Sequence, residues 1–237
     1  MTHPDYPGDE RARVERWRPR PACRARTIGG RTVSLAPFDA ALHGNGLWRA
    51  LGGRQTNERI RWFGWPLLEA PADLVTVIER HALDGWSTSV MLLDGEAAGM
   101  ASYMREDAAN GVVEIGAIAH GTAMARTPAA TEAHALLMRH AFSLGYRRYE
   151  WKCDDANAAS KRAALRLGFT REGTFRQHQV KHGRNRDTAW FSILDGEWPR
   201  VEAALTAWLE PRNFDDAGRQ RRSLTDIRGT DGARAHG

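Results

Sequence analysis

Hydrophobic and polar positions alternate with a period of two in the first half of the chain, which indicates β-strands. This alternation is seen in residues 31–37, and residues 87–93 and 97–104 are also expected to be strands. The dipeptide Asp94 and Gly95 separates the last two segments and predicts a tight hairpin turn between them. Residues 111–119 continue the pattern after a polar loop, so we expect an antiparallel series of strands.

Apolar residues that recur every three or four positions predict helices elsewhere, with Asp39 as a cap for the first of them. The expected helices are residues 39–51, 71–83, 131–144, 158–167 and 197–210, and the remaining expected strands are 148–152, 169–179 and 188–194. Strands and helices alternate in the second half, which is typical of a βαβ unit. The sequence therefore predicts a mixed α/β fold with a central sheet of about seven strands.

The two ends differ in composition from the middle. Residues 1–30 are rich in Pro, Arg and Gly and show no sustained period, so we expect a flexible basic arm, with Trp17 packing back onto the domain. Residues 31–210 form one domain in this interpretation. Residues 211–237 are polar and are expected to be a partly disordered tail.

The net charge of +5 lies at the ends of the chain. Residues 31–210 carry 21 positive and 21 negative side chains, which argues against nucleic-acid binding. We found no apolar run long enough to cross a membrane and no secretory leader, so we expect a cytoplasmic protein. The two cysteines, Cys23 and Cys153, provide no disulfide framework, and no metal site is expected.

One local charge asymmetry remains between Lys161 and Arg186, where eight basic residues accompany a single acid, Glu172. Such a cluster can be a solvated helix face followed by a hairpin. It can also be a positive rim for a phosphate-bearing cofactor or an acidic substrate.

A loop of small residues joins the strand at 111–119 to the next helix. Pro128 suits the first helical position, because its missing N–H would be unpaired there. The first-turn N–H groups attract anions, and Arg126 adds a cation beside them. Small side chains at Thr127, Ala129 and Ala130 allow a phosphate to approach the backbone. The alternative is an ordinary helix start.

Three motifs in this region resemble those of the GNAT superfamily of acyltransferases. Its acyl-CoA loop reads Arg/Gln-x-x-Gly-x-Gly/Ala, and here Arg126, Ala129 and Thr131 stand at the three specified positions. Asn-Ala-Ala-Ser at 157–160, followed by Leu-Gly-Phe at 167–169 and Glu-Gly at 172–173, is similar to the second signature of the RimJ/RimL-like branch. The resemblance covers about residues 31–200 and implies a GNAT fold.

The resemblance also implies site residues. Acetyl-CoA is the expected co-substrate, with its phosphates at Arg126, Thr127, Ala129, Ala130 and Thr131. Its thioester is expected at the backbone N–H groups of Ala117, Ile118 and Ala119, and Asn157 and Ser160 are expected near the pantetheine. Most members of the superfamily use a tyrosine as the acid, but that position is Ala164 here. We therefore expect Ser160 to protonate the leaving thiolate.

Two residues compete for the role of general base, namely Glu114 on the strand and His120 at its end. Trp62 and Trp65 belong to a loop that borders the acceptor pocket in this superfamily, and His120 is placed beside that pocket.

The expected function is direct transfer of an acetyl group to a primary amine, either a protein N-terminus or a small molecule, by a monomer or homodimer. Two alternatives stay open. One is a CoA-binding regulatory module without turnover, and the other is a succinyl-type acyltransferase that uses a carboxylated acyl-CoA.

Overall fold

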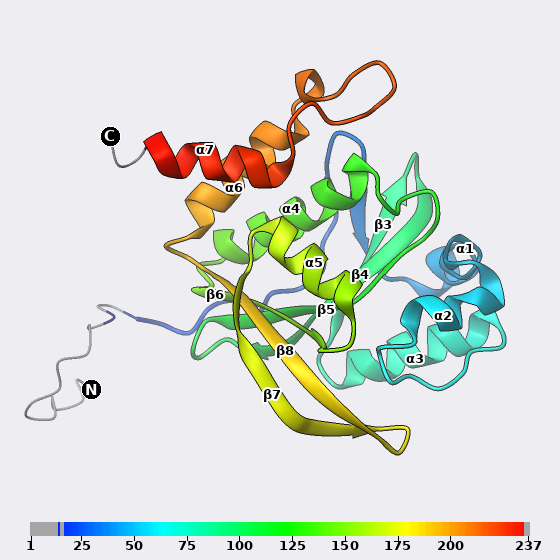
Figure 1. The fold of residues 1–237 in the computed structure, drawn as a ribbon. Helices are drawn as coiled ribbons and strands as arrows, with labels where there is room; N and C mark the ends of the chain where they lie inside the picture. Colours follow the sequence, from blue (N-terminus) through cyan, green and yellow to red (C-terminus); the bar gives the residue numbers. More distant parts are fainter. Residues whose placement is uncertain (1–13, 15–16, 235–237) are drawn as a thin grey trace, which may run out of the picture.

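A mixed sheet of eight strands forms the centre of the protein (Figure 1). The computed structural model describes residue 14 and residues 17–234. The strand order is β1-β2-β3-β4-β5-β6-β8-β7, and only the pair β5 and β6 is parallel. The strands are β1 (Ile28–Gly29), β2 (Ser34–Pro37), β3 (Ser87–Leu93), β4 (Glu96–Asp107), β5 (Val112–His120), β6 (Arg148–Asp154), β7 (Thr170–Lys181) and β8 (Arg184–Leu194). The predicted mixed α/β sheet is therefore confirmed, with β1 as one strand more than expected.

Helices cover the sheet, and most begin and end where the sequence pattern predicts. They are α1 (Ala40–Leu51), α2 (Thr56–Ile60), α3 (Pro71–Leu83), α4 (Pro128–Ser143), α5 (Ala158–Leu167), α6 (Trp198–Leu209) and α7 (Leu224–Arg234), with short 3-10 turns η1 (Gly53–Gln55) and η2 (Pro211–Asn213). The Asp39 carboxylate caps α1 by accepting the Leu42 N–H over 2.9 Å. Within the described residues, no helix is long and apolar enough to cross a membrane.

Two hydrophobic clusters lie on opposite faces of the sheet, because alternate side chains of each strand point to opposite sides. The larger cluster joins the sheet to α4 and α6 and includes Val113 and Ile115 of β5. The smaller one joins it to α1 and α3 and includes Ala119 of the same strand. The side chain of Glu114, between Val113 and Ile115, consequently points away from α4.

The N-terminal segment is not a free arm over its described part. Cys23 is fully buried, and the Cys23 N–H donates to the Glu106 carboxylate over 2.5 Å. The predicted packing of Trp17 is confirmed, because its indole N–H donates to the Ala109 carbonyl over 2.7 Å. The expectation of a flexible arm is therefore wrong for residues 17–30, which pack against the domain. Residues 1–13 and 15–16 lie outside the described residues.

The C-terminal segment also continues the fold beyond residue 210, where a tail was expected. Leu224 and Ile227 of α7 are 1% and 5% exposed and belong to the larger cluster. The polar, Arg-rich composition concealed these two apolar positions, which lie three residues apart on one helix face. The start of this segment and the first turns of α7 are thus part of the folded domain, and residues 235–237, at the end of the predicted tail, lie outside the described part.

The sheet divides between its two parallel strands. Pairing of β5 with β6 runs only from Val112 and Arg148 to Ile115 and Trp151. Beyond these pairs β5 continues to His120 beside β4, while β6 continues to Asp154 beside β8. The two strands thus separate after four residue pairs, and the functional cavity lies around this gap.

Candidate active site

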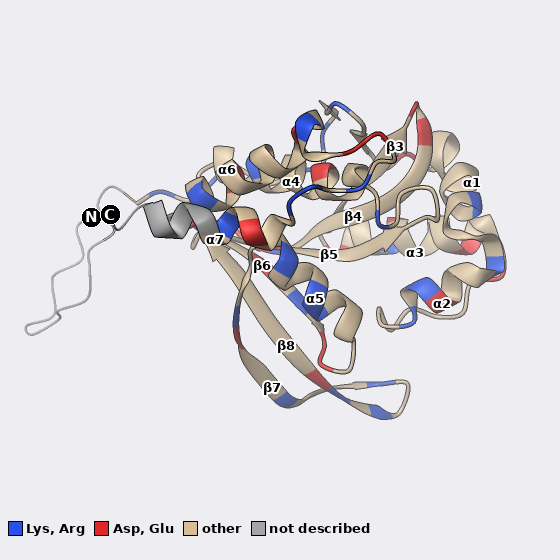
Figure 2. Cartoon of the chain, turned by 45° about the horizontal axis from the view of Figure 1, so that its top comes forward, with Lys and Arg blue, Asp and Glu red and all other residues tan. Residues whose placement is uncertain are grey.

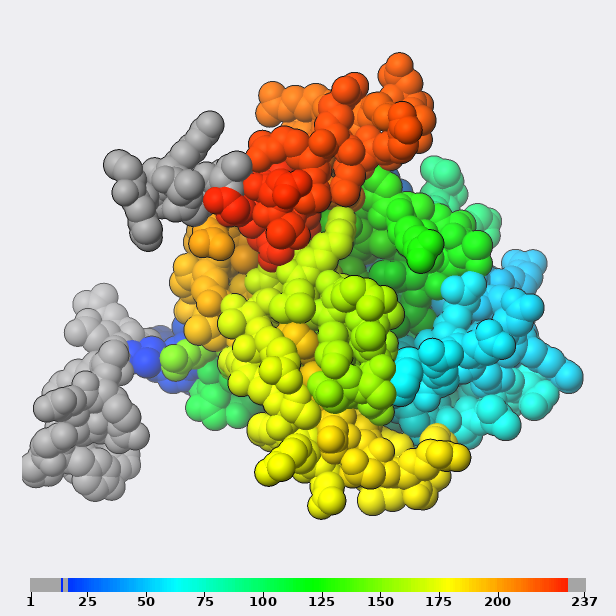
Figure 3. All heavy atoms as spheres, in the orientation of Figure 1, coloured from blue at the N-terminus to red at the C-terminus, as the bar shows by residue number. Residues whose placement is uncertain are grey.

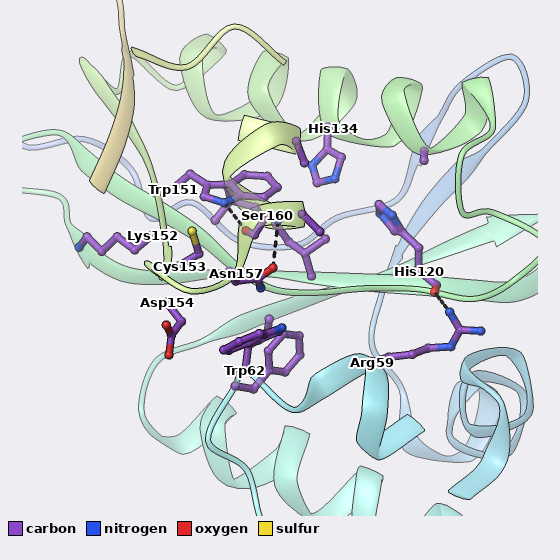
Figure 4. A pocket seen from close by; sticks show the side chains of 18 of the residues that line it. Arg59, Trp62, His120, His134, Trp151, Lys152, Cys153, Asp154, Asn157 and Ser160 are labelled. Carbon is purple, nitrogen blue, oxygen red and sulfur yellow. Dashed lines mark hydrogen bonds between the residues drawn. The ribbon is translucent and has the colours of Figure 1, made fainter. Parts of the chain in front are cut away.

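A cavity of about 1560 Å³ surrounds the gap between β5 and β6. Pockets for small ligands usually measure roughly 300–1,000 Å³, so this one has room for two substrates. Its walls come from the α2–α3 loop, the start of α4, the side of α5 that carries Ser160 and Ala163, and the β7–β8 hairpin. In Figure 3 the yellow hairpin reaches the cyan segment that contains α2, and α5 lies above the contact. Figure 4 shows Trp62 and Asn157 facing each other across this space.

A β-bulge interrupts β5 beside the cavity. Met100 pairs with Ala119 and Ser102 pairs with Gly116, so two residues of β5, Ala117 and Ile118, oppose one residue of β4. Ala117 has φ of 47°, which is unusual for a residue other than glycine. A bulge turns backbone N–H groups out of the strand ladder. The expected thioester contact at Ala117, Ile118 and Ala119 therefore lies at an irregular stretch of backbone that borders the cavity.

The first backbone N–H groups of α4 are not capped by a side chain. Thr127 occupies the N-cap position, but its hydroxyl donates to the Met124 carbonyl and does not cap the helix. Pro128 is the first helical residue, as predicted. Arg126 is exposed at the cavity with φ of 66°, and Ala130 lines the same wall. The uncapped helix start is consistent with the expected anion site.

Arg166 completes this wall. Its guanidinium donates to Thr131 Oγ1 over 2.9 Å and stacks over the Trp208 ring at 4.7 Å. Ala163 and Leu167 of the same helix also line the cavity, whereas the neighbouring Arg162 is exposed and does not. Two arginines, Arg126 and Arg166, therefore border the start of α4.

Glu114 is buried at the cavity wall on the face opposite α4. Its carboxylate is 3.0 Å from Lys152 Nζ and 3.2 Å from an Arg105 guanidinium nitrogen. Lys152 Nζ also lies 2.8 Å from the Glu150 carboxylate and 3.6 Å above the centre of the Trp190 ring. Burial raises the pKa of Glu114, and the positive charges of Lys152 and Arg105 oppose that effect. The result is a buried carboxylate that can hold or release a proton.

The hydroxyl of Ser160 is fixed by two neighbours at the first turn of α5. Trp151 Nε1 donates to Ser160 Oγ over 2.9 Å, and the Ser160 N–H donates to Asn157 Oδ1 over 3.1 Å (Figure 4). Asn157 therefore caps α5. Since Ser160 Oγ accepts from the indole, its own hydrogen remains available to a group in the cavity. Ala164, where a tyrosine is usual, is fully buried.

Two histidines line the opposite wall. His134 of α4 is 3% exposed, and the centre of its ring lies 5.4 Å from that of His120 at the end of β5 (Figure 4). Within the described part of the chain, the buried atoms His134 Nδ1 and His120 Nε2 have no hydrogen-bond partner. Burial lowers the pKa of His120 to about 4 and that of His134 to about 3. Both rings are therefore neutral at physiological pH.

The loop with Trp62 and Trp65 borders the cavity on the side of Glu114, as expected. Trp65 contacts Phe63 edge-on at 5.1 Å between ring centres and stacks on His81 at 5.5 Å. His81 stacks in turn on Trp86 at 4.0 Å. These contacts fix Trp65, whereas Trp62 projects into the cavity (Figure 4).

Several lining residues were missed at the level of sequence, among them His134, Lys152, Arg105, Phe214 and Arg219. Lys152 follows Trp151 in an alternating strand, so its position on the Glu114 face could have been inferred from the pairing of the two strands. His134 lies on the apolar stripe of α4, and a polar residue on such a buried face could have indicated a site residue. Phe214 and Arg219 follow α6 in the segment that was expected to be a tail, and no local pattern indicates them.

Lysine and arginine residues gather on α5 and on the β7–β8 hairpin (Figure 2). Within the hairpin, Lys181 and Arg186 line the cavity, whereas Arg184 belongs to the exposed turn. The basic residues between Lys161 and Arg186 thus serve in part to line the cavity, and most of the others are exposed to solvent. Among the described residues, no group of three or more His, Cys, Asp or Glu side chains is arranged to hold a metal ion.

Comparison with known proteins identifies the family. Residues 35–170 match the family described as "Acetyltransferase (GNAT) domain". A GCN5-related N-acetyltransferase from Brucella melitensis is 43% identical, with a TM-score of 0.86, and the match covers 91% of this chain and 100% of that one. A probable GNAT-family acetyltransferase from Chromobacterium violaceum is 37% identical, with a TM-score of 0.75 and coverage of 84% and 100%.

More distant structures share the fold alone. The ribosomal L7/L12 α-N-protein acetyltransferase RimL is 21% identical with a TM-score of 0.61, and the match covers 72% of this chain and 94% of that one. Among curated proteins, none matches this chain. This chain belongs to the GNAT family of acetyltransferases, enzymes that use acetyl-CoA.

Proposed function

We propose that this protein transfers the acetyl group of acetyl-CoA directly to a primary amine inside the cavity between β5 and β6. In this reaction the amine nitrogen forms a bond to the thioester carbon, the C–S bond breaks, and the CoA thiolate takes up a proton. The observation that carries the proposal is one continuous cavity, which joins the start of α4, the bulge at Ala117 and the buried carboxylate of Glu114.

The cofactor end of this cavity is the α4 side. The backbone N–H groups that follow Thr127, together with Arg126, Arg166 and Ala130 at the cavity wall, would hold the phosphates. The Ala129 side chain is buried in the core, so this residue would contribute only through its backbone. Thr131 keeps Arg166 in place through the bond to its hydroxyl. The pantetheine chain would extend between the separated strands toward Ala117, Ile118 and Ala119, where backbone N–H groups can polarise the thioester oxygen.

Glu114 is the general base in this proposal. The amine must lose a proton, and a buried carboxylate with a raised pKa accepts protons better than an exposed one. Glu114 also faces the side of the sheet on which the α2–α3 loop and the hairpin form the acceptor wall. His120 is the weaker candidate, because its ring lies beside His134 of α4 and its pKa is lowered to about 4.

Ser160 is the proton donor for the leaving thiolate. The bond from Trp151 fixes its oxygen and leaves the hydroxyl hydrogen free to point at a sulfur atom in the cavity. Asn157 holds the first turn of α5 that carries this serine. The Cys153 thiol lies within hydrogen-bond reach of the same hydroxyl, so its hydrogen would turn from Cys153 to the sulfur of CoA.

The assignment of a branch within the family and of an acceptor class rests on sequence motifs. The Asn-Ala-Ala-Ser motif at 157–160 and the Leu-Gly-Phe motif at 167–169 support the RimJ/RimL-like branch, whose acceptors include protein N-termini and small amines. We propose a protein N-terminus or a small-molecule amine as the acceptor, with Trp62, Trp65 and His120 beside it. A cytoplasmic monomer or homodimer is part of the same proposal.

The proposal is tested by measuring the release of free CoA thiol from acetyl-CoA in the presence of a panel of amines and peptides. Time-dependent release that requires both the acceptor and Glu114 is expected. The contrasting function is a CoA-binding module without turnover. It would bind acetyl-CoA and depend on Arg126, yet release no thiol with any acceptor.

A further inference from the structure

The acceptor end of the cavity combines aromatic and basic side chains. Its walls are the α2–α3 loop, the end of α3 and the inner face of the β7–β8 hairpin, where Gln179, Lys181, Arg186 and Thr188 line the cavity. These residues lie on the Glu114 side of the sheet, away from the start of α4. A ligand here is therefore distinct from the phosphates of CoA.

Lys181 bridges the hairpin and the aromatic loop. A Cβ atom on Gly64 would lie 2.8 Å from Lys181 Cδ, so the lysine side chain lies directly across the glycine, whose φ is +74°. A side chain at position 64 would strain the backbone and displace the lysine. Within the described residues, Lys181 forms no ion pair, so its ammonium is available at the cavity.

Arg186 contributes a second, more buried cation. Its side chain is 14% exposed, and one terminal nitrogen donates to Gln179 Oε1 over 3.0 Å. Among the described residues, its Nε atom is buried and has no hydrogen-bond partner, because the nearest carboxylate, Asp154, lies 3.9 Å away. A buried donor without a partner is unfavourable. The guanidinium therefore has hydrogen-bonding capacity that a ligand can satisfy.

The carboxylates nearby offset these two cations only in part. Asp154 lies 3.9 Å from Arg186 Nε, and Glu114 is paired with Arg105 and Lys152. Asp84 lies 3.6 Å from His81. Arg61 and Arg80 add further positive charge at the rim. A site of this kind repels an ammonium ion and attracts an anion, and it also favours the neutral, reactive form of an amine.

We propose that the acceptor carries, in addition to its amine, an anionic carboxylate or phosphate group that Lys181 and Arg186 bind, with its planar or apolar part against Trp62. This inference rests on the proposed acetyl transfer, since it names the class of acceptor for that site. Arg and Lys bind both kinds of anion, and Arg can do so through two parallel hydrogen bonds. Trp62 offers a ring face for the remainder of the molecule.

Matched amines test this assignment. One pair is tyramine and its phosphate ester, and the other is 4-(2-aminoethyl)benzamide and 4-(2-aminoethyl)benzoate. Each pair has the same aminoethyl arm and differs in the anion. Calorimetric titration of each amine into CoA-saturated protein should show at least about tenfold tighter binding of the anionic member, as one charge-assisted hydrogen bond contributes roughly 1.5–3 kcal/mol.

The variants Lys181→Gln and Arg186→Gln should each reduce this preference about tenfold, whereas Arg184→Gln on the exposed turn should leave it unchanged. Equal binding within both pairs, no binding of any of the four amines, or a preference that survives both cavity variants would overturn the inference. Tighter binding of succinyl-CoA than of acetyl-CoA, lost in the same two variants, would place the anion on the acyl donor and also overturn it. CoA binding is measured separately, so its loss would count against the proposed function and not against the choice of acceptor.

Discussion

Trp151 donates its indole N–H to the hydroxyl oxygen of Ser160 over 2.9 Å, and this bond joins the parallel strand β6 to the first turn of α5. It makes Ser160 a donor toward the cavity. We expect Ser160→Ala to lower kcat about tenfold or more, because the thiolate would leave unprotonated. Trp151→Phe keeps the hydroxyl but removes its orientation, so it should reduce kcat by less. Steady-state kinetics of both variants measure this order, and a normal kcat in Ser160→Ala would remove the serine from the mechanism.

Loss of the base should affect turnover and not cofactor binding. We expect Glu114→Gln to lower kcat roughly 10²-fold or more, in the range for a general base, with the Kd for acetyl-CoA unchanged. Glu150 is the matched control, since it is also buried and also pairs with Lys152 but does not line the cavity. Glu150→Gln should retain activity within a few-fold. If the two variants were equally slow, the effect would belong to the charge network and not to proton transfer.

The two arginines beside α4 should matter for affinity. We expect Arg126→Gln and Arg166→Gln each to raise the Kd for acetyl-CoA about tenfold, since each removes a charge-assisted contact to a phosphate. Arg162→Gln provides the comparison on the exposed face of α5 and should leave the Kd as it is. Titration calorimetry at two salt concentrations separates this contact from general screening.

The buried histidines should make the fold sensitive to acid. In the folded protein the pKa is lowered to about 4 for His120 and about 3 for His134, whereas an unfolded histidine titrates near 6.5. The unfolded state therefore binds more protons below about pH 6.5, and the free energy of unfolding should fall as the pH decreases from there toward 3. Urea denaturation at several pH values measures this slope. His134→Gln should reduce it, while His182→Gln, at the exposed hairpin turn, should not.

The C-terminal helix should contribute to stability. We expect Leu224→Ala to lower the free energy of unfolding by about 2–4 kcal/mol, because it removes a buried leucine side chain from the main core. Leu42→Ala on α1, where the leucine is 77% exposed, should change it little. Equal unfolding midpoints for the two variants would show that α7 adds nothing to the fold.

Periodicity predicted the elements of this protein well, because most of them carry a buried stripe or an alternating face. The helix Pro71–Leu83 and the strand Ser87–Leu93 have the expected bounds. The short helix α2 was missed, since five residues are too few to show a period of 3.6. The strand Ile28–Gly29 was missed for the same reason.

Residues of the candidate site could be predicted from the sequence only where they belong to a recognisable motif. The motifs indicated Arg126, Asn157 and Ser160, and all three line the cavity. No motif indicated Arg166. Its place at the cavity wall depends on Trp208, which is distant in sequence. Long-range packing of this kind leaves no local pattern.

The separation of β5 from β6 places two open sheet edges inside the molecule. At a protein surface such edges promote aggregation, because their free N–H and C=O groups pair with strands from other chains. Here the helices α4 and α5 flank the opening. A slender, amide-bearing chain can still enter and use the free backbone groups. Such a substrate would form the hydrogen bonds that β5 and β6 do not form with each other, and the sheet would be complete only while the substrate is bound.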